Sequence, residues 1–244
     1  MSGRLLVGTS GFAYPGWAPR FYPAGTAAQE LLPYYSSRLP AVELNNTFYA
    51  TPPVARVEAW CAAVPESFRF SVKAQRGGSL FALLRDPAEA LARLLPPYRA
   101  FGARLGTVLF RVPGQVRRDS AALERLLGAW SAEVPLAMEF QDPTWHVDET
   151  FSRLAQAGAA VCLTDRPEDD DPPIVRLTGQ FLYLRLRRDD YGPAELATWA
   201  ARLEPFLSDG RDAFVFFKHD PVGRGAELAV ALRELLPDAA SPAA

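Results

Sequence analysis

The sequence predicts an α/β protein of the TIM type, a parallel eight-stranded (β/α)8 barrel. Three observations predict this fold. Eight short apolar runs alternate with helical patterns or long loops at about 30 residues per unit, which favours a parallel sheet with right-handed crossovers. The chain has 244 residues, the usual size of such a barrel. No linker rich in proline, glycine or charge divides it, so we assign residues 1–244 to a single domain.

The strands are predicted from short runs that are continuously apolar or that alternate between apolar and polar side chains. They span residues 5–8, 41–45, 68–73, 107–112, 136–140, 159–164, 181–186 and 213–218. Helices are predicted where apolar residues recur with helical spacing, and Pro87 and Asp119 suit a first turn and a cap. They span residues 31–39, 54–61, 87–101, 120–130, 148–157, 193–207 and 225–236.

Residues 165–180 break the alternation. They contain four prolines or glycines and an acidic run without helical period, so we predict that a loop replaces the helix after strand six. We predict a frayed tail over residues 237–244. The rival fold is an open doubly wound sheet, but the turn from Gly8 to Gly11 lacks the full dinucleotide-binding fingerprint.

The composition excludes several classes of protein. A formal net charge of −2 gives no bulk attraction to nucleic acid or anionic membranes. Cys61 and Cys162 lie about 100 residues apart among apolar neighbours, which indicates small core residues and not a disulfide scaffold. The chain has neither a signal-peptide core nor a run of about 20 apolar residues, so we predict a cytoplasmic protein without a membrane partner.

Polar residues recur where the predicted strands end, which is the end of a barrel that carries its chemistry. Placing charges in apolar strands costs several kcal/mol unless they are paired, so this recurrence indicates a site. The alternative is a set of buried ion pairs, such as Glu43 with Lys73 or Glu139 with Arg185, that only fill the barrel. The strand-end residues are Glu43, Asn45, Ser71, Lys73, Arg111, Glu139, Gln141, Thr164, Asp165, Arg185, Arg187, Lys218, His219 and Asp220.

Cations outnumber carboxylates in this ring, which favours an anionic ligand. We predict Glu43, Glu139 and His219 as catalytic acids or bases. The predicted substrate-binding residues are Asn45, Tyr49, Lys73, Arg111, Gln141, Trp145, Arg185 and Lys218. Aromatic residues in the loops above suit a sugar or a base, or else pack together as a lid: Phe12, Tyr14, Trp17, Phe21, Tyr22, Phe48, Tyr49, Trp145 and Tyr191.

No metal site is predicted, and the cofactor is left unknown. The chain has two histidines, His146 and His219, fewer than a multinuclear zinc site needs. One divalent cation on Glu43, Glu139 and Asp165 is a less favoured alternative.

Several of these stretches resemble the YecE-like family, also called domain-of-unknown-function family 72. The resemblance covers nearly the whole chain, and its most specific element is the stretch from Glu43 to Tyr49. It implies a barrel distantly like sugar-phosphate isomerases and abasic-site endonucleases, with no established function. The other matching stretches are residues 7–12 with Trp17, 21–23, 70–74, 109–113, 138–140 with Trp145, and 183–186.

This sequence departs from the family pattern at the ring. The family tends to have Gln where Arg111 stands and Arg where Gln141 stands, which suggests that a positive charge is exchanged between strands four and five. The family often has His near Arg187 and an Asn pair near Lys218 and His219; here the first His is missing and His219 stands instead. A mechanism that used a strand-seven His could not operate unchanged.

We therefore predict an enzyme that acts on a small anionic, sugar- or nucleotide-like substrate by general acid/base chemistry, as a hydrolase, lyase or isomerase. The second hypothesis is a protein that processes or binds single-stranded nucleic acid, with the aromatic rim stacking a base. The third is a non-catalytic binding or partner protein. The oligomeric state stays open.

Overall fold

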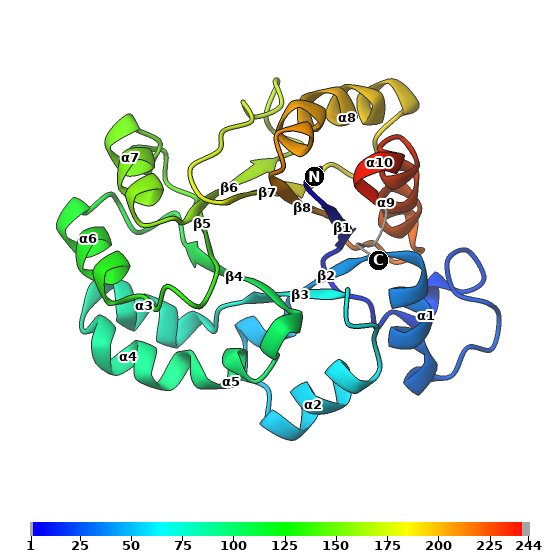
Figure 1. The fold of residues 1–244 in the computed structure, drawn as a ribbon, viewed down its shortest axis with the longest axis horizontal. Coiled ribbons are helices and arrows are strands. Elements are labelled where there is room, and N and C mark those ends of the chain that lie inside the picture. Colours follow the sequence, from blue (N-terminus) through cyan, green and yellow to red (C-terminus); the bar gives the residue numbers. More distant parts are fainter. Residues whose placement is uncertain (1, 241–244) are drawn as a thin grey trace.

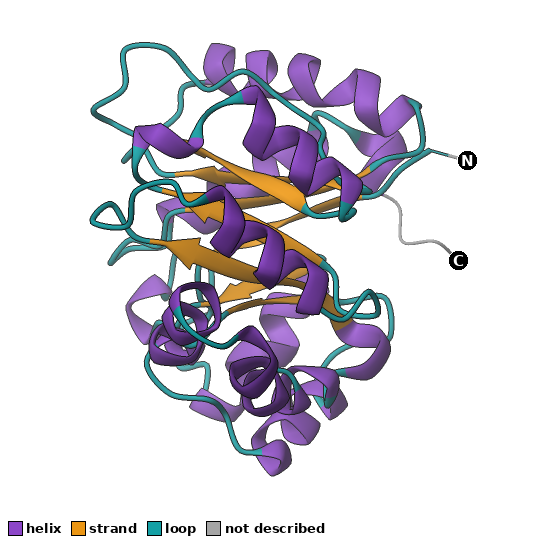
Figure 2. Cartoon of the chain, turned by 90° about the vertical axis from the view of Figure 1, so that its left-hand side faces the viewer, coloured by secondary structure: helices purple, strands orange, loops and turns teal. Residues whose placement is uncertain are grey.

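Eight parallel strands form one nearly closed barrel, surrounded by helices. The computed structural model describes residues 2–240, and the strand order is β1-β8-β7-β6-β5-β4-β3-β2. Figure 1 shows the strands as a ring with the helices outside it, and Figure 2 shows the strands lying between layers of helices. This confirms the predicted TIM-type fold.

The strands are β1 (Leu5–Thr9), β2 (Ala41–Leu44), β3 (Arg69–Lys73), β4 (Leu105–Val112), β5 (Leu136–Phe140), β6 (Ala160–Asp165), β7 (Phe181–Leu186) and β8 (Asp212–Phe217). The helices are α1 (Leu31–Arg38), α2 (Val54–Ala62), α3 (Arg76–Leu84), α4 (Pro87–Leu94), α5 (Pro96–Arg99), α6 (Ser120–Ala129), α7 (Asp148–Gln156), α8 (Pro193–Ser208), α9 (Arg224–Glu234) and α10 (Pro237–Ala240). Short 3-10 turns lie at Pro15–Trp17, Ala28–Glu30, Asn46–Phe48, Gly102–Arg104 and Pro143–Trp145.

Three local predictions need correction. The helix predicted over 87–101 is broken into α4 and α5, because Pro96 and Pro97 cannot continue the hydrogen bonds of α4. Helix α3 was not predicted, since Gly77 and Gly78 lower its propensity; the Gln75 side chain caps it by accepting from Gly78 N at 2.7 Å.

The predicted frayed tail is the third correction. Residues 237–240 form α10, and Ala239 is buried against the core, so apolar packing orders this segment. The rest of that prediction, residues 241–244, lies outside the described residues.

The segment after β6 has no helix, as predicted, but it is tied to the barrel. Arg188 bonds the carboxylate of Asp165 at 2.9 Å and the carbonyl of Asp169 at 2.8 Å. Thr178 Oγ1 accepts from Val161 N and donates to the carbonyl of Ala159, both at 2.8 Å. We call residues 166–180 the tethered loop.

The barrel closes between β1 and β2 through a side chain. These strands share only an isolated bridge between Ser10 and Glu43. The buried Tyr35 hydroxyl accepts from Thr9 N at 2.8 Å and donates to the carbonyl of Ala41 at 3.1 Å, so it replaces a ladder bond. Gly8 permits the close approach, because a Cβ there would lie 1.8 Å from the carbonyl oxygen of Ala41. We call this junction the seam.

Replacing Tyr35 with phenylalanine is expected to lower the free energy of unfolding by about 1–3 kcal/mol, because a backbone donor and acceptor stay buried without a partner. Urea denaturation at pH 7 measures the change. Tyr34→Phe is the matched control, since the Tyr34 ring is only half-buried on the same helix and its hydroxyl is not in the seam. Equal effects of the two variants would contradict the proposed bridge.

The inside of the barrel has an apolar layer below a polar layer. Inward side chains from seven of the strands form a separate, mainly apolar buried cluster: Leu6, Ala41, Leu109, Ala137, Ala160, Cys162, Phe181, Tyr183, Phe214 and Phe216. Aromatic rings dominate the β7 and β8 side of it. Because this cluster fills much of the barrel interior, the inward polar residues meet at the carboxyl ends of the strands.

Within residues 2–240 no helix has the length and apolar character that a bilayer crossing requires.

Candidate functional site

A buried arginine joins two carboxylates across the barrel. Arg185 Nη2 donates to Glu43 Oε1 at 2.8 Å, and its Nη1 donates to Glu139 Oε1 at 2.9 Å. Each of these residues is at most 4% exposed. Since β7, β2 and β5 are not neighbours in the sheet, the guanidinium ties three separate strands together at one level. The prediction of a structural pair between Glu139 and Arg185 is therefore confirmed in geometry, with Glu43 as an additional partner.

Hydroxyl groups complete this network. The Tyr183 hydroxyl donates to Glu43 Oε2 at 2.7 Å and lies 2.7 Å from Ser71 Oγ. Thr164 Oγ1 donates to Glu139 Oε1 at 3.0 Å. Each oxygen of Glu43 thus accepts a hydrogen bond, which defines the position of the carboxylate.

Glu139 has one buried oxygen without a hydrogen bond in the described structure. Its Oε2 lies 3.1 Å from Arg111 Nε, but the two groups are misaligned and neither atom makes a hydrogen bond within the described residues. Burial raises the pKa of Glu139, and the charges of Arg185 and Arg111 outweigh it and lower this pKa to about 2. Burial and Arg185 act on Glu43 in the same way, with a net lowering of its pKa. Both carboxylates are therefore ionised at neutral pH, and the lowered pKa makes Glu139 a weak base while Arg185 and Arg111 stay beside it.

Two cations of the mouth have no acidic partner within 4 Å in the described part of the chain. Lys73, 8% exposed, places Nζ 4.4 Å from the centre of the Phe48 ring. Arg187 is half-buried and donates to Ser10 Oγ at 3.0 Å. With Arg111 and Arg185, these cations exceed Glu43 and Glu139 by two positive charges.

His219 is held in one tautomer by Ser10. Ser10 Oγ accepts from Arg187 Nη1 and from His219 N, so its own proton goes to His219 Nδ1 at 3.2 Å. The imidazole proton is thereby assigned to Nε2. Burial and the charge of Arg187 lower the pKa of His219, which favours the neutral ring. Tyr14 stacks on this ring at 5.0 Å with an interplanar angle of 3°.

Some predicted site residues lie elsewhere. Trp145 is fully buried, stacks on Phe140 and donates to the carbonyl of Val116, so the prediction that it contacts substrate is wrong. Asp165 points away from the two glutamates and bonds Arg188 and the Tyr191 hydroxyl, which removes the three-carboxylate cation site. In residues 2–240 no group of three or more His, Cys, Asp or Glu is placed to hold a metal.

Other predicted contacts lie at the rim and stay predictions. Lys218 pairs with Asp189 at 2.7 Å, and Tyr49 is 81% exposed. Asn45 follows β2, and its Oδ1 is buried without a hydrogen-bond partner in the described structure. Gln141 follows β5 two residues after Glu139, on the same face by strand alternation.

The aromatic cluster after β1 divides between the two predicted roles. Trp17, Phe21 and Tyr22 are buried and pack on one another, which is the lid interpretation. Phe12 and Tyr14 are half-buried and line a cavity of about 670 Å³ beside the mouth, together with Asn45.

Asp220 caps α9 by accepting from Arg224 N and Gly225 N, so this carboxylate stabilises the start of the helix.

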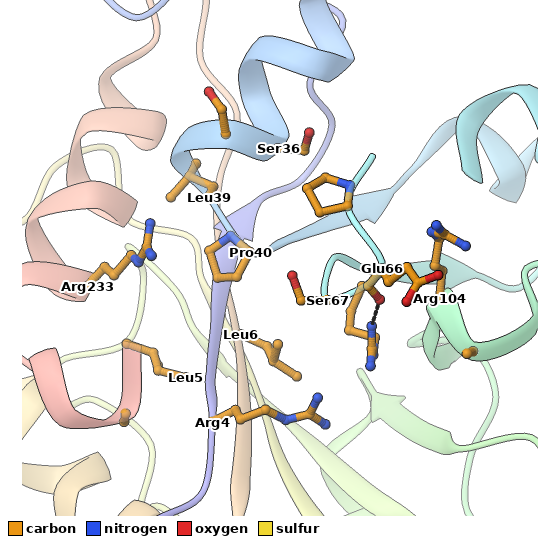
Figure 3. Close-up of a pocket in the computed structure, with 15 residues that line it drawn as sticks. Arg4, Leu5, Leu6, Ser36, Leu39, Pro40, Glu66, Ser67, Arg104 and Arg233 are labelled. Carbon is orange, nitrogen blue, oxygen red and sulfur yellow. Dashed lines mark hydrogen bonds between the residues drawn. The ribbon is translucent and has the colours of Figure 1, made fainter. Parts of the chain in front are cut away.

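A second cavity, of about 730 Å³, opens at the opposite end of the barrel. Figure 3 shows Leu6, Pro40 and Ser67 around it, from segments that open or precede the strands. Arg4 pairs there with Asp212 at 2.6 Å, and Arg69 donates to the carbonyl of Glu66 at 2.7 Å, whereas Nε of Arg104 is buried without a hydrogen-bond partner in the described structure. We place the candidate site at the mouth, because polar side chains from several strands meet there and the carboxyl ends of the strands carry the chemistry of such barrels.

Sequence reasoning missed two polar residues of this network, Tyr183 and Ser10, and it placed Ser71 and Arg187 at strand ends without a binding or catalytic role. A signal existed for Tyr183, because it precedes Arg185 by two residues and therefore shares its inward face. Ser10 carried no signal, since it follows β1 in a glycine-containing turn.

Comparisons with known proteins agree with this architecture. The family described as "Protein of unknown function DUF72" matches residues 6–243. The UPF0759 protein YunF of Bacillus subtilis (strain 168) is 28% identical over 91% of this chain and 92% of its own length.

Solved structures show the same fold. A DUF72 family protein from Thermotoga maritima MSB8 has a TM-score of 0.84 at 23% identity, covering 96% of this chain and 99% of its own. Another from Enterococcus faecalis V583 has a TM-score of 0.72 at 22% identity, covering 87% and 95%. The resemblance noted in the sequence is therefore confirmed: the chain belongs to the DUF72 family of proteins of unknown function.

Proposed function

We propose that this protein is an enzyme that binds a small anionic molecule at the barrel mouth and transforms it by general acid/base chemistry. The observation that carries the proposal is the excess of two positive charges there, on Lys73 and Arg187. A concave site with uncompensated cations, beside carboxylates fixed in position, attracts an anion and can move a proton on it.

The contacts divide the residues by role. Arg185 forms ion pairs with Glu43 and Glu139, so its role is to position these carboxylates. Arg187 and Lys73 keep capacity for a phosphate or carboxylate group. His219 offers an Nε2–H donor, and the role of Glu139 as acid or base stays a prediction. The identity of the substrate, whether sugar- or nucleotide-like, and the cytoplasmic location stay predictions.

A thermal-shift screen tests the proposal. Inorganic phosphate, sugar phosphates, nucleotides and short single strands are each added with and without Mg²⁺. A ligand at about 100 times its Kd adds about 2.7 kcal/mol, or several degrees of Tm. We expect a shift in the wild type that is lost in Arg187→Gln and Lys73→Ala.

Arg93→Gln is the matched control, because it removes the same charge from an 80% exposed side chain on α4. It should keep the wild-type shift. A shift with single strands alone, falling steeply with salt, would favour the nucleic-acid hypothesis. No shift with any ligand would contradict the proposal and favour a non-catalytic partner protein.

The exchange between Arg111 and Gln141 gives a further prediction. Arg111→Gln is expected to weaken binding of the anion found in the screen about tenfold, or about 1.4 kcal/mol, because one ring charge is lost. Adding Gln141→Arg restores that charge on the adjacent strand, and affinity should return to within about threefold of wild type. Titration calorimetry measures the anion affinity of both variants. If the double variant binds as weakly as Arg111→Gln, the positive charge cannot be moved from strand β4 to strand β5.

A further inference from the structure

We propose that Lys73 Nζ is a nucleophile that forms an imine with the carbonyl carbon of a small aldehyde or ketone that also carries an anionic group. The inference deepens the proposed function, on which it rests, by naming the substrate class and the reacting atom. Arg187 would hold the anionic group and Lys73 the carbonyl carbon.

Lysine is rare in this chain, and both lysines lie at the mouth. Of the 26 basic residues only Lys73 and Lys218 are lysines, and the other 24 are arginines. Each lysine stands at the carboxyl end of a barrel strand, β3 or β8. An arginine side chain stays protonated and cannot supply an amine lone pair, so these are the chain's two candidate side-chain amines.

The two lysines differ in their surroundings. Lys218 forms a 2.7 Å ion pair with Asp189 at the exposed rim. Lys73 lies inside the mouth against Phe48, and its side chain makes no hydrogen bond or ion pair within residues 2–240. Its Nζ is not one of the fully buried polar atoms that lack a hydrogen bond in the described structure, so a ligand in the mouth can reach it.

This environment favours the unprotonated amine. Burial, and then the charge of Arg185, lower the pKa of Lys73 to about 8, against the opposing charges of Glu43 and Glu139. At pH 7 about a tenth of such a side chain is a free amine, over a hundredfold more than for an ordinary lysine with a pKa of about 10.4. Desolvation beside other cations is a known way to activate a lysine for imine formation.

The step balances without an oxidant or a metal. The Nζ lone pair attacks the carbonyl carbon, the C=O π pair moves to oxygen, and that oxygen takes a proton as nitrogen loses one. The resulting carbinolamine loses its hydroxyl as water after protonation, and the nitrogen lone pair forms the C=N bond. The net reaction takes up one proton from solvent, releases one water and leaves a protonated imine.

Reductive trapping tests the proposal. The folded protein at pH 7 is incubated with glyoxylate or glyceraldehyde 3-phosphate and cyanoborohydride, whose hydride converts an imine to a stable secondary amine. Peptide mapping by mass spectrometry then compares Lys73 with Lys218, which serves as the internal control. We expect Lys73 to be labelled at least about tenfold faster. Neutral acetaldehyde should keep only the part of this selectivity that comes from the free amine, and the carboxylate and phosphate probes distinguish the two anionic groups.

Variants separate this inference from the proposed function. Lys73→Arg keeps the charge and should retain the anion-induced thermal shift without trapping, and Lys73→Met should lose both. Labelling of Lys73 no faster than Lys218, with the thermal shift intact, would overturn the imine and leave the anion site standing. Absence of both the selective labelling and the thermal shift in the wild type would overturn both proposals.

Discussion

Replacing Arg185 with methionine is expected to lower the free energy of unfolding by about 3–5 kcal/mol at pH 7. The change leaves Glu43 and Glu139 ionised, buried and without their common partner, and an uncompensated buried charge is strongly destabilising. Guanidinium denaturation followed by circular dichroism measures the loss.

The control removes the charges together. A triple variant, Arg185→Met with Glu43→Gln and Glu139→Gln, leaves no buried charge in the network and should recover at least about half of the loss. If Arg185→Met alone lies within about 1 kcal/mol of wild type, the network does not hold the strands as described.

The same network predicts a dependence on pH. The folded-state pKa of Glu139 is depressed to about 2, so its stabilisation is present above the unfolded pKa of about 4.3 and is lost as pH falls towards 2. A shift of this size corresponds to about 3 kcal/mol. Wild type should lose stability across this window, and Arg185→Met should lose less, because protonation then relieves an unpaired charge.

The second large effect is expected at the seam. Gly8→Ala is expected to cost more than about 4 kcal/mol or to prevent folding, because the new Cβ would lie 1.8 Å from the carbonyl oxygen of Ala41 and 2.8 Å from the Tyr35 hydroxyl. The backbone at Ala41 cannot move away from this Cβ unless β1 and β2 separate.

Gly128→Ala is the matched control. Gly128 lies in α6, where an added methyl group would meet no atom within 4 Å, so alanine should stabilise the protein by about 0.5–1 kcal/mol. Chemical denaturation of both variants gives the comparison. A Gly8→Ala protein as stable as wild type would show that the seam is looser than described.

The fold was largely predictable from the sequence, because buried parallel strands are apolar runs that differ plainly from their helices. Strand alternation also placed Glu43, Lys73, Glu139 and Arg185 on inward faces. Their partners were not predictable, since alternation gives a side chain's direction and not the distance across the barrel. Arg185 bonds Glu43 from a strand 142 positions away.

The misses have physical causes as well. Trp145 follows β5, as the predicted residues of the mouth follow their strands. Its indole N–H donates to the carbonyl of Val116 and its ring stacks on Phe140, so packing holds it in the core and away from the mouth. Helix α3 forms despite two glycines because Gln75 caps it and its buried face packs on the core. Propensity is a weak prior where tertiary contacts compensate.

The tethered loop bears on how fast a ligand can enter. Arg188, Thr178 and the Arg202 contact to the carbonyl of Pro173 hold it at several points, and we expect a ligand to bind without a large opening of this loop. Association should then be governed by diffusion and by the attraction of the positive mouth. The association rate constant for an anion would fall as salt rises, while its dissociation rate constant would change little.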